Sequence, residues 1–240
     1  ARGTYAGVME KIPYLKELGI TAVELMPVTE FDEIMMSSSG SGFHNAKQEP
    51  TGYVNYWGYG PSYLYAVKTA YASRETMSAE GEFKTLVKEL HKAGIECIPE
   101  MYFTGKELPG EILSVLRYWV EEYHVDGFHL TGFPDLSLAA EDPFLKRTKL
   151  FAENWNDVMN RRPKQGYVTL GDGAVSVEEK NLAEYNMQFM EDMRRFLKGD
   201  EGMLSAFELR NRRNPMEYAV INYMANTNGF TLMDTVSYDR

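Results

Sequence analysis

The alternation of strand-like and helix-like segments constrains the fold of this chain more than any other feature of its sequence. Short apolar runs with the length of buried strands are separated by segments in which apolar residues recur every three or four positions, as in amphipathic helices. Several helical segments stop at a glycine, among them Gly19, Gly94 and Gly199. The helix-to-strand links are short and the strand-to-helix loops are long, which is typical of βα units with a parallel sheet.

The expected elements can be placed by residue range. Helices are predicted at residues 5–18, 83–93 and 111–123, and strands at residues 21–27, 95–103, 125–130, 149–153 and 220–225. Residues 181–198 are predicted to hold a brief strand and then an amphipathic helix. Residues 37–42 (S-S-S-G-S-G) are predicted to form the tip of a surface loop.

About six strands followed by long loops predict an α/β fold of the TIM (β/α)8-barrel type, with functional side chains at the carboxyl ends of the strands. Because a closed barrel has eight strands, we expect the first and last strands to be missing from this chain. The expected organisation is a single incomplete barrel domain over residues 1–240, a fragment of a longer protein. A doubly wound open sheet is the competing fold, but no G-x-G-x-x-G motif follows a predicted strand.

Composition and charge exclude several classes of function. A hydrophobic content of 44% and an aromatic content of 13% indicate a packed globular chain. The formal net charge of -10 would repel nucleic acid and anionic membranes, so neither is an expected partner, whereas an uncharged glycan suits it. No apolar run reaches the ~20 residues of a membrane-spanning helix, and no signal peptide is visible. The single cysteine, Cys97, is expected to be buried in a strand, which fits a cytoplasmic location.

Several ordered segments carry a family resemblance. They read V-D-G-F-H-L-T at 125–131, N-Y-M-A-N-T-N-G-F at 222–230, G-T-Y-A-G-V-M-E-K-I-P-Y-L-K-E-L-G-I-T-A-V-E-L-M-P-V at 3–28 and N-Y-W-G-Y-G-P at 55–61. Together they resemble the α-amylase superfamily of glycoside hydrolases, in its isoamylase and glycogen-debranching branch. The resemblance covers nearly the whole chain and implies a TIM barrel that acts on α-glucan or maltooligosaccharide.

The resemblance also implies a retaining mechanism with a carboxylate nucleophile and a carboxylic general acid, and this chain departs from that pattern. The nucleophile position carries Thr131, and the orienting arginine two residues earlier is replaced by His129. The third carboxylate position carries Asn228, whereas the general-acid position keeps its carboxylate as Glu153. Since a neutral hydroxyl without an adjacent base is a poor nucleophile, we expect hydrolysis to be impaired.

Other carboxylates offer an alternative. Glu100, Asp135 and Asp172 lie on or after predicted strand ends, where a relocated nucleophile could face the pocket. Asp135 is instead predicted to be a solvated loop residue or a cap, and Glu100 to be hydrogen-bonded within the barrel mouth. Asp126 keeps the structural position of its motif.

Neither a metal nor a cofactor is expected from the sequence. His44, His91 and His124 are scattered, and no metal-ligand spacing surrounds His129, which is predicted to be an isosteric filler.

Aromatic residues point to glycan binding. By resemblance, Tyr59 is the tyrosine that stacks beneath the reacting sugar, and Trp57 lies beside it, while Trp155 follows the acid position and could flank the same pocket. Packing in the protein core is the alternative for Tyr56 and Trp57.

Three hypotheses follow. The first is a catalytically impaired, glycan-binding relative of glycogen-debranching enzymes. The second is an active α-1,6- or α-1,4-glucan hydrolase with Glu153 as general acid and a relocated nucleophile. The third is a non-catalytic scaffold that binds protein. The oligomeric state stays open.

Overall fold

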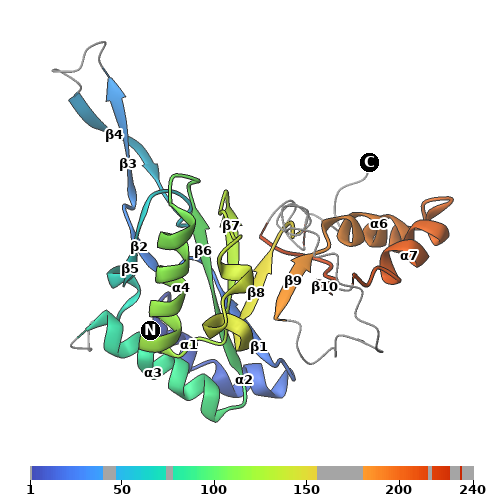
Figure 1. The fold of residues 1–240 in the computed structure, drawn as a ribbon, viewed down its shortest axis with the longest axis horizontal. Helices are drawn as coiled ribbons and strands as arrows, with labels where there is room; N and C mark the ends of the chain where they lie inside the picture. Colours follow the sequence, from blue (N-terminus) through green and yellow to red (C-terminus); the bar gives the residue numbers. More distant parts are fainter. Residues whose placement is uncertain are drawn as a thin grey trace. The chain divides into compact units, whose positions relative to one another are not determined.

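The computed structural model describes residues 2–39, 47–73, 78–155, 181–215, 218–227 and 233 (Figure 1). The chain forms two compact units, Ala1–Leu150 and Phe151–Arg240. The expectation of one barrel domain over the whole chain stays a prediction.

The first unit is built on a parallel sheet. Its strands are ordered β1 (Ala22–Leu25), β6 (Glu96–Phe103), β7 (Gly127–Gly132) and β8 (Lys149–Ala152), and the last of these begins in the first unit and ends in the second. The β1–β6 and β6–β7 pairs are parallel. The predicted strands 21–27, 95–103, 125–130 and 149–153 therefore coincide with observed strands to within a few residues at each end.

The register of these strands decides which side chains share a face. Glu24 lies opposite Ile98, Glu100 opposite His129, and Tyr102 opposite Thr131. Because side chains alternate between the two faces of a strand, these six residues lie on the same face of the sheet.

The opposite face of the sheet is covered by helices. It presents Cys97, Met101 and Phe103, which are fully buried. Helix α3 (Ala79–Lys92) packs against β6, and α4 (Pro109–Tyr123) packs against α3 and β5. Figure 1 shows α3 and α4 on one side of these strands. The predicted burial of Cys97 is confirmed, and burial raises the pKa of its thiol to about 12.

Three aromatic residues fill the centre of this helical layer. Phe83 of α3 meets Trp119 and Tyr123 of α4, with ring centroids 5.6 and 5.4 Å away. The Trp119 indole N–H donates to the Leu64 carbonyl at 2.7 Å, so a buried polar atom is satisfied and α4 is tied to β5.

The prediction of a single helix at residues 5–18 is wrong. The structure has two helices, α1 (Tyr5–Met9) and α2 (Ile12–Glu17). Pro13 lies in the first turn of α2, where its missing N–H costs nothing, whereas in the interior of one long helix it would break a hydrogen bond. Helix α3 begins earlier than predicted, because Ser78 accepts a hydrogen bond from Gly81 N and caps it.

Two antiparallel pairs were not predicted. β2 (Thr29–Phe31) pairs with β5 (Ser62–Val67), and β3 (Ile34–Ser39) pairs with β4 (Lys47–Val54). Both pairs contain a register shift, which breaks the strict alternation that marks a strand in a sequence. The predicted loop tip at 37–42 is wrong for residues 37–39, which end β3, and residues 40–42 lie outside the described residues.

Short helical turns complete the first unit. They are the 3-10 helices η1 (Thr69–Tyr71), η2 (Ala139–Glu141) and η3 (Phe144–Arg147).

In the second unit, the end of β8 pairs with β9 (Leu182–Tyr185). β9 in turn pairs in parallel with β10 (Ala219–Ile221). Helix α6 (Met187–Lys198) follows β9 as predicted, and Asn186 caps it by accepting from Phe189 N. Helix α7 (Met203–Asn211) was not predicted, and it packs on α6 through Phe196 and Phe207, whose rings stack at 4.9 Å. β10 is shorter than the predicted strand at 220–225.

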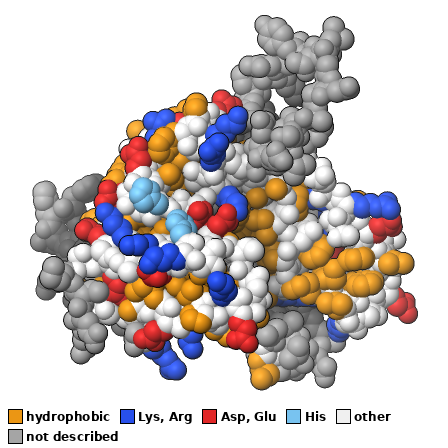
Figure 2. All heavy atoms as spheres, turned by 90° about the horizontal axis from the view of Figure 1, so that it is seen from below, with side chains coloured by type: hydrophobic (Ala, Val, Ile, Leu, Met, Phe, Trp, Pro, Cys, Tyr) orange, Lys and Arg blue, Asp and Glu red, His pale blue; other side chains and the backbone are white. Residues whose placement is uncertain are grey.

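Two further properties concern possible partners. In the described residues, none of the helices has the length and apolar character needed to cross a membrane. On the face drawn in Figure 2, acidic and basic side chains are interspersed among hydrophobic ones.

An ion pair gives the first unit a pH-dependent stability. The Arg117 guanidinium of α4 holds the pKa of the buried Asp142 carboxyl below its ordinary value, and the N–H groups of Phe144 and Leu145 donate to the same carboxylate. Because the folded pKa is depressed, this stabilisation is present above the unfolded pKa of about 3.9 and is lost as the pH falls through the folded pKa. We expect Asp142→Asn to lower the thermal midpoint at pH 7, and the gap from wild type to shrink below about pH 4.

The control for this prediction is the exposed neighbour Glu141. Glu141→Gln should leave the midpoint at pH 7 nearly unchanged. A gap between wild type and Asp142→Asn that stays constant down to about pH 2 would show that the carboxylate contributes no pH-dependent stability.

Candidate active site

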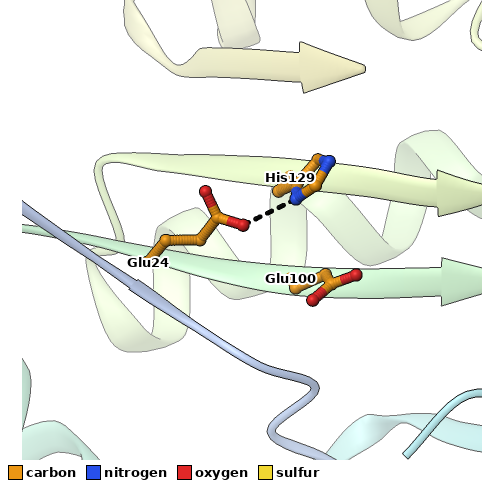
Figure 3. A group of neighbouring side chains, drawn as sticks. All are labelled: Glu24, Glu100 and His129. Atoms are coloured by element: carbon orange, nitrogen blue, oxygen red, sulfur yellow. Dashed lines mark hydrogen bonds and ion pairs between the residues drawn. The ribbon is translucent and has the colours of Figure 1, made fainter. Parts of the chain in front are cut away.

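Three polar side chains converge on the face of the sheet that lies opposite the helices. Glu24 of β1, Glu100 of β6 and His129 of β7 each bring a ligand-type atom within 4.8 Å of the others. His129 Nδ1 and Glu24 Oε1 lie 2.6 Å apart and form a hydrogen bond. Figure 3 shows the three side chains on neighbouring strands, with Glu24 and His129 pointing toward each other. We call Glu24, Glu100 and His129 the carboxylate–histidine cluster.

Glu100 is the buried member of the cluster, with 3% of its surface exposed. Burial raises the pKa of its carboxyl above the ordinary value, and the charge of Glu24 acts in the same direction. His129 and hydrogen bonds from Tyr59 and Thr131 oppose this shift.

The Thr131 hydroxyl has the Glu100 carboxylate beside it, which was not predicted from the sequence. Its hydroxyl hydrogen-bonds to Glu100 and also lies 3.4 Å from the Met101 carbonyl oxygen. The contact follows from the register, since Thr131 lies opposite Tyr102, two residues beyond Glu100 on β6. The expectation that this hydroxyl lacks an adjacent base is wrong.

An ordered loop places aromatic side chains near this face. Asn55 Oδ1 accepts from Gly58 N at 3.0 Å, and Asn55 Nδ2 donates to the Tyr59 carbonyl at 3.1 Å, which closes the loop. The Tyr59 and Tyr102 rings lie 5.5 Å apart with a tilt of 41°. Tyr59 thus joins the loop to the cluster through its hydrogen bond to Glu100.

Trp57 and Tyr56 lie on the surface of this loop. Trp57 is 44% exposed, and its ring makes an edge-on contact with the more exposed Tyr56 at 5.5 Å. The alternative interpretation, in which these two residues pack in the core, is wrong. An exposed aromatic pair on a closed loop offers apolar faces to a ligand.

Other residues that the sequence analysis singled out have structural partners. Asp126 accepts from Cys97 N and contacts His91 Nε2, both at 2.8 Å, and so links β7 to β6 and α3. Asp135 accepts from Ser137 N at 3.1 Å, which agrees with a local cap.

The remaining predicted site residues belong to the second unit. Glu153 is exposed at the end of β8. Burial raises the pKa of the Tyr223 hydroxyl, and the charge of Glu153 acts in the same direction, so the two groups are neighbours. Asn228, Asp172 and the first-unit residue His44 lie outside the described residues.

Trp155 occupies a packing position in the second unit. It is 0% exposed, its indole N–H donates to the Ala183 carbonyl at 2.8 Å, and its backbone N–H donates to Glu184 at 3.1 Å. With no exposed face, its ring is not offered to a sugar in this structure.

Two residues of the first-unit site were missed. Glu24 could have been found as the one charged residue in the strand-like run T-A-V-E-L-M-P, and Tyr102 as an aromatic two residues after Glu100. Their proximity to His129 depends on strand pairing, which the sequence does not state.

Gly58 fixes the shape of the loop at residues 55–59, which we call the aromatic loop. Its φ is +79°, and a Cβ atom there would lie 2.8 Å from Phe31 Cε1 and 3.0 Å from Pro27 Cβ. Gly19 has nearly the same φ, +81°, but open space around it. We expect Gly58→Ala to cost about 1–3 kcal/mol more than Gly19→Ala, because overpacking adds to the backbone strain that both share.

Chemical denaturation of both variants checks this difference. Equal losses for Gly58→Ala and Gly19→Ala would mean that the Phe31 ring moves aside at no cost.

Comparison with known proteins agrees with this geometry. The family model described as "Alpha amylase, catalytic domain" matches residues 1–101. Two solved structures have this fold. The pneumococcal glycogen-degrading virulence factor SpuA matches with a TM-score of 0.66 at 18% identity, covering 98% of this chain and 30% of that one. Pullulanase SAP of group B Streptococcus, solved with maltotetraose, matches with a TM-score of 0.62 at 17% identity, covering 98% and 38%.

The parallel sheet and its helical layer agree with the α-amylase-type fold of these structures, and the prediction of an incomplete TIM-type barrel is confirmed. The chain is 32% identical to isoamylase 3, chloroplastic, of Oryza sativa subsp. japonica over 320 residues, which cover 100% of this chain and 38% of that protein. It is 30% identical to a glycogen operon protein GlgX homolog of Haemophilus influenzae, covering 100% and 43%.

The resemblance to the isoamylase and glycogen-debranching branch that the sequence shows is confirmed by these relatives. The chain spans 38% and 43% of the lengths of these two relatives.

Proposed function

We propose that this chain is an α-glucan-binding domain of the isoamylase and glycogen-debranching type in which hydrolysis is impaired. The observation that carries the proposal is Thr131, a neutral hydroxyl at the position where the resemblance implies a nucleophilic carboxylate. The domain is proposed to act in the cytoplasm, because its buried free cysteine requires no oxidising compartment.

Glycan binding is supported by the aromatic loop. A pyranose packs its C–H face against an aromatic ring, and the exposed Trp57 and Tyr56 provide such faces. Polar groups of the cluster can accept hydrogen bonds from sugar hydroxyls, which orients a ligand that the aromatic rings hold. Maltooligosaccharides are the proposed ligand class, as in the pullulanase SAP complex with maltotetraose.

Impaired hydrolysis is supported by the loss of charge at two positions. Retention requires a carboxylate that forms a glycosyl intermediate and a second group that protonates the leaving oxygen. Thr131 and Asn228 are both neutral, so neither can stabilise a developing positive charge as an aspartate would. Glu153 alone could protonate a leaving group but would leave the sugar cation without a partner.

The test is calorimetry with maltotetraose, combined with an assay of reducing ends on the same samples. We expect binding without release, and Trp57→Ala should weaken binding at least about tenfold, which is about 1.4 kcal/mol. Tyr14→Ala is the matched control, because Tyr14 is also an exposed aromatic residue but lies on α2, outside the aromatic loop. Equal binding by Trp57→Ala and wild type would overturn the assignment of the loop.

A second candidate function is favoured by the burial and hydrogen bonds of Glu100. If Glu100 is a relocated carboxylate and Glu153 the general acid, reducing ends should be released, and both Glu100→Gln and Glu153→Gln should abolish release. If neither binding nor release is observed, a protein-binding scaffold becomes the better explanation.

A further inference from the structure

We propose that the carboxylate–histidine cluster, Glu24, Glu100 and His129, is a binding site for a divalent first-row transition-metal ion such as Zn²⁺. The proposal goes beyond glycan binding and does not depend on it, since metal binding can be measured without a glycan.

The geometry of the three groups fits a metal site. They come from three adjacent strands of the parallel sheet, and their ligand atoms already lie within 4.8 Å of one another (Figure 3). Around a tetrahedral ion with bonds of about 2.1 Å, ligand atoms lie about 3.4 Å apart. Small side-chain rotations of Glu24 and Glu100 would bring the ligand atoms to this separation. The backbones need not move, because the strand register already places the two residues beside His129.

The donor set selects the class of ion. An imidazole nitrogen favours zinc, iron, copper or nickel, whereas sites for calcium and magnesium are built from oxygen alone. One imidazole with two carboxylates resembles zinc sites that have three protein ligands and keep a fourth position for water. Glu24 has a side chain that is 36% exposed, so an ion could enter from its side of the cluster.

The electrostatics of the cluster favour a cation. The two carboxylates carry a formal charge of about −2 when both are ionised, in a site where Glu100 is removed from water. Glu100 is 3% exposed, and a carboxylate oxygen of Glu24 lies within 4.8 Å of one of its own. A divalent ion would neutralise both carboxylates at once.

The surroundings of Glu100 support its role as a ligand. Tyr59 and Thr131 hydrogen-bond to its carboxylate, and outer groups of this kind orient the ligands of metal sites. At position 129, the arginine expected from the family resemblance has no lone pair for a metal, whereas histidine has one. The sequence did not indicate this site, because His129 and Glu24 are 105 residues apart in the chain.

The experiment titrates the whole chain, freed of metal by a chelator, with Co²⁺ and follows its visible absorption. We expect one equivalent of Co²⁺ to bind with the d–d bands of a site that contains nitrogen, and Zn²⁺ to displace it. His129→Ala and Glu100→Gln should each weaken binding at least about tenfold. His91→Ala is the matched control, because His91 contacts Asp126 outside the cluster and should leave the titration unchanged.

Folding is checked for every variant by circular dichroism, and Glu24→Gln provides a variant at an exposed position that is expected to fold. Zn²⁺ should raise the thermal midpoint of wild type, and raise it less in Glu24→Gln. The proposal is overturned if wild type shows no cobalt bands, or if the bands persist in folded His129→Ala.

Discussion

Lys68→Met is expected to lower the free energy of unfolding of the first unit by about 3–5 kcal/mol. The Lys68 ammonium group is almost fully buried, with 3% of the residue exposed, and donates to Glu30 Oε1 and to the Phe31 carbonyl, both at 2.8 Å. Glu33 Oε1 lies 3.1 Å away, and the Phe31 ring centroid lies 4.2 Å away. Methionine keeps the apolar stem but leaves the buried Phe31 carbonyl and the partly exposed Glu30 carboxylate without their cation, and the cost arises from those unpaired acceptors.

Denaturant titration of Lys68→Met measures the loss directly. Lys84→Met is the matched control, because Lys84 also pairs with a glutamate, Glu122, but does so on the surface, and we expect its midpoint to be nearly unchanged. A loss for Lys68→Met no larger than that for Lys84→Met would contradict the prediction.

The same substitution should affect the aromatic loop. Lys68 supports the Phe31 backbone and ring, and Phe31 is the residue against which Gly58 packs. If Phe31 shifts, the loop that presents Trp57 loses its support. We therefore expect the maltotetraose affinity of Lys68→Met to fall even under conditions in which the variant is folded.

Glu82→Ala is expected to cost about 3–5 kcal/mol, because three donors lose a shared buried acceptor. Glu82 lies in α3 with 2% of its surface exposed. Its Oε1 accepts from Ala6 N at 2.7 Å, and its Oε2 accepts from Ser73 N and Ser73 Oγ at 2.8 and 2.9 Å. The carboxylate thus joins α1 and the segment after η1 to α3, and its removal leaves backbone N–H groups buried without acceptors.

Thermal and denaturant unfolding of Glu82→Ala should be compared with Glu111→Ala. Glu111 is an exposed first-turn glutamate of α4, and its replacement removes only a favourable interaction with the helix dipole. The loss of stability in Glu82→Gln should be intermediate, since the glutamine amide keeps one acceptor oxygen and presents a donor where the other oxygen was. Losses that are equal for Glu82→Ala and Glu111→Ala would show that Glu82 is not a structural acceptor.

Much of the fold could be predicted from the sequence because it depends on local periodicity. The strands that form β1, β6 and β7 and the helices α3 and α4 are each marked by their own apolar spacing. The burial of Cys97 followed from its place in such a run. The antiparallel pairs β2–β5 and β3–β4 escaped prediction, since their register shifts interrupt the alternation that a strand would otherwise show.

The sequence by itself determined the class of fold, the resemblance to the family branch, and the presence of Thr131 and Asn228 at two positions where that resemblance implies carboxylates. Each of these can be read from residues close together in the chain. Only the tertiary structure decided that Glu24, Glu100 and His129 meet, and that Thr131 has Glu100 beside it. It also decided that Lys68 and Glu82 are buried. Contacts of this kind depend on strand register and on packing between distant segments, and a shift of one residue would turn these side chains to the opposite face.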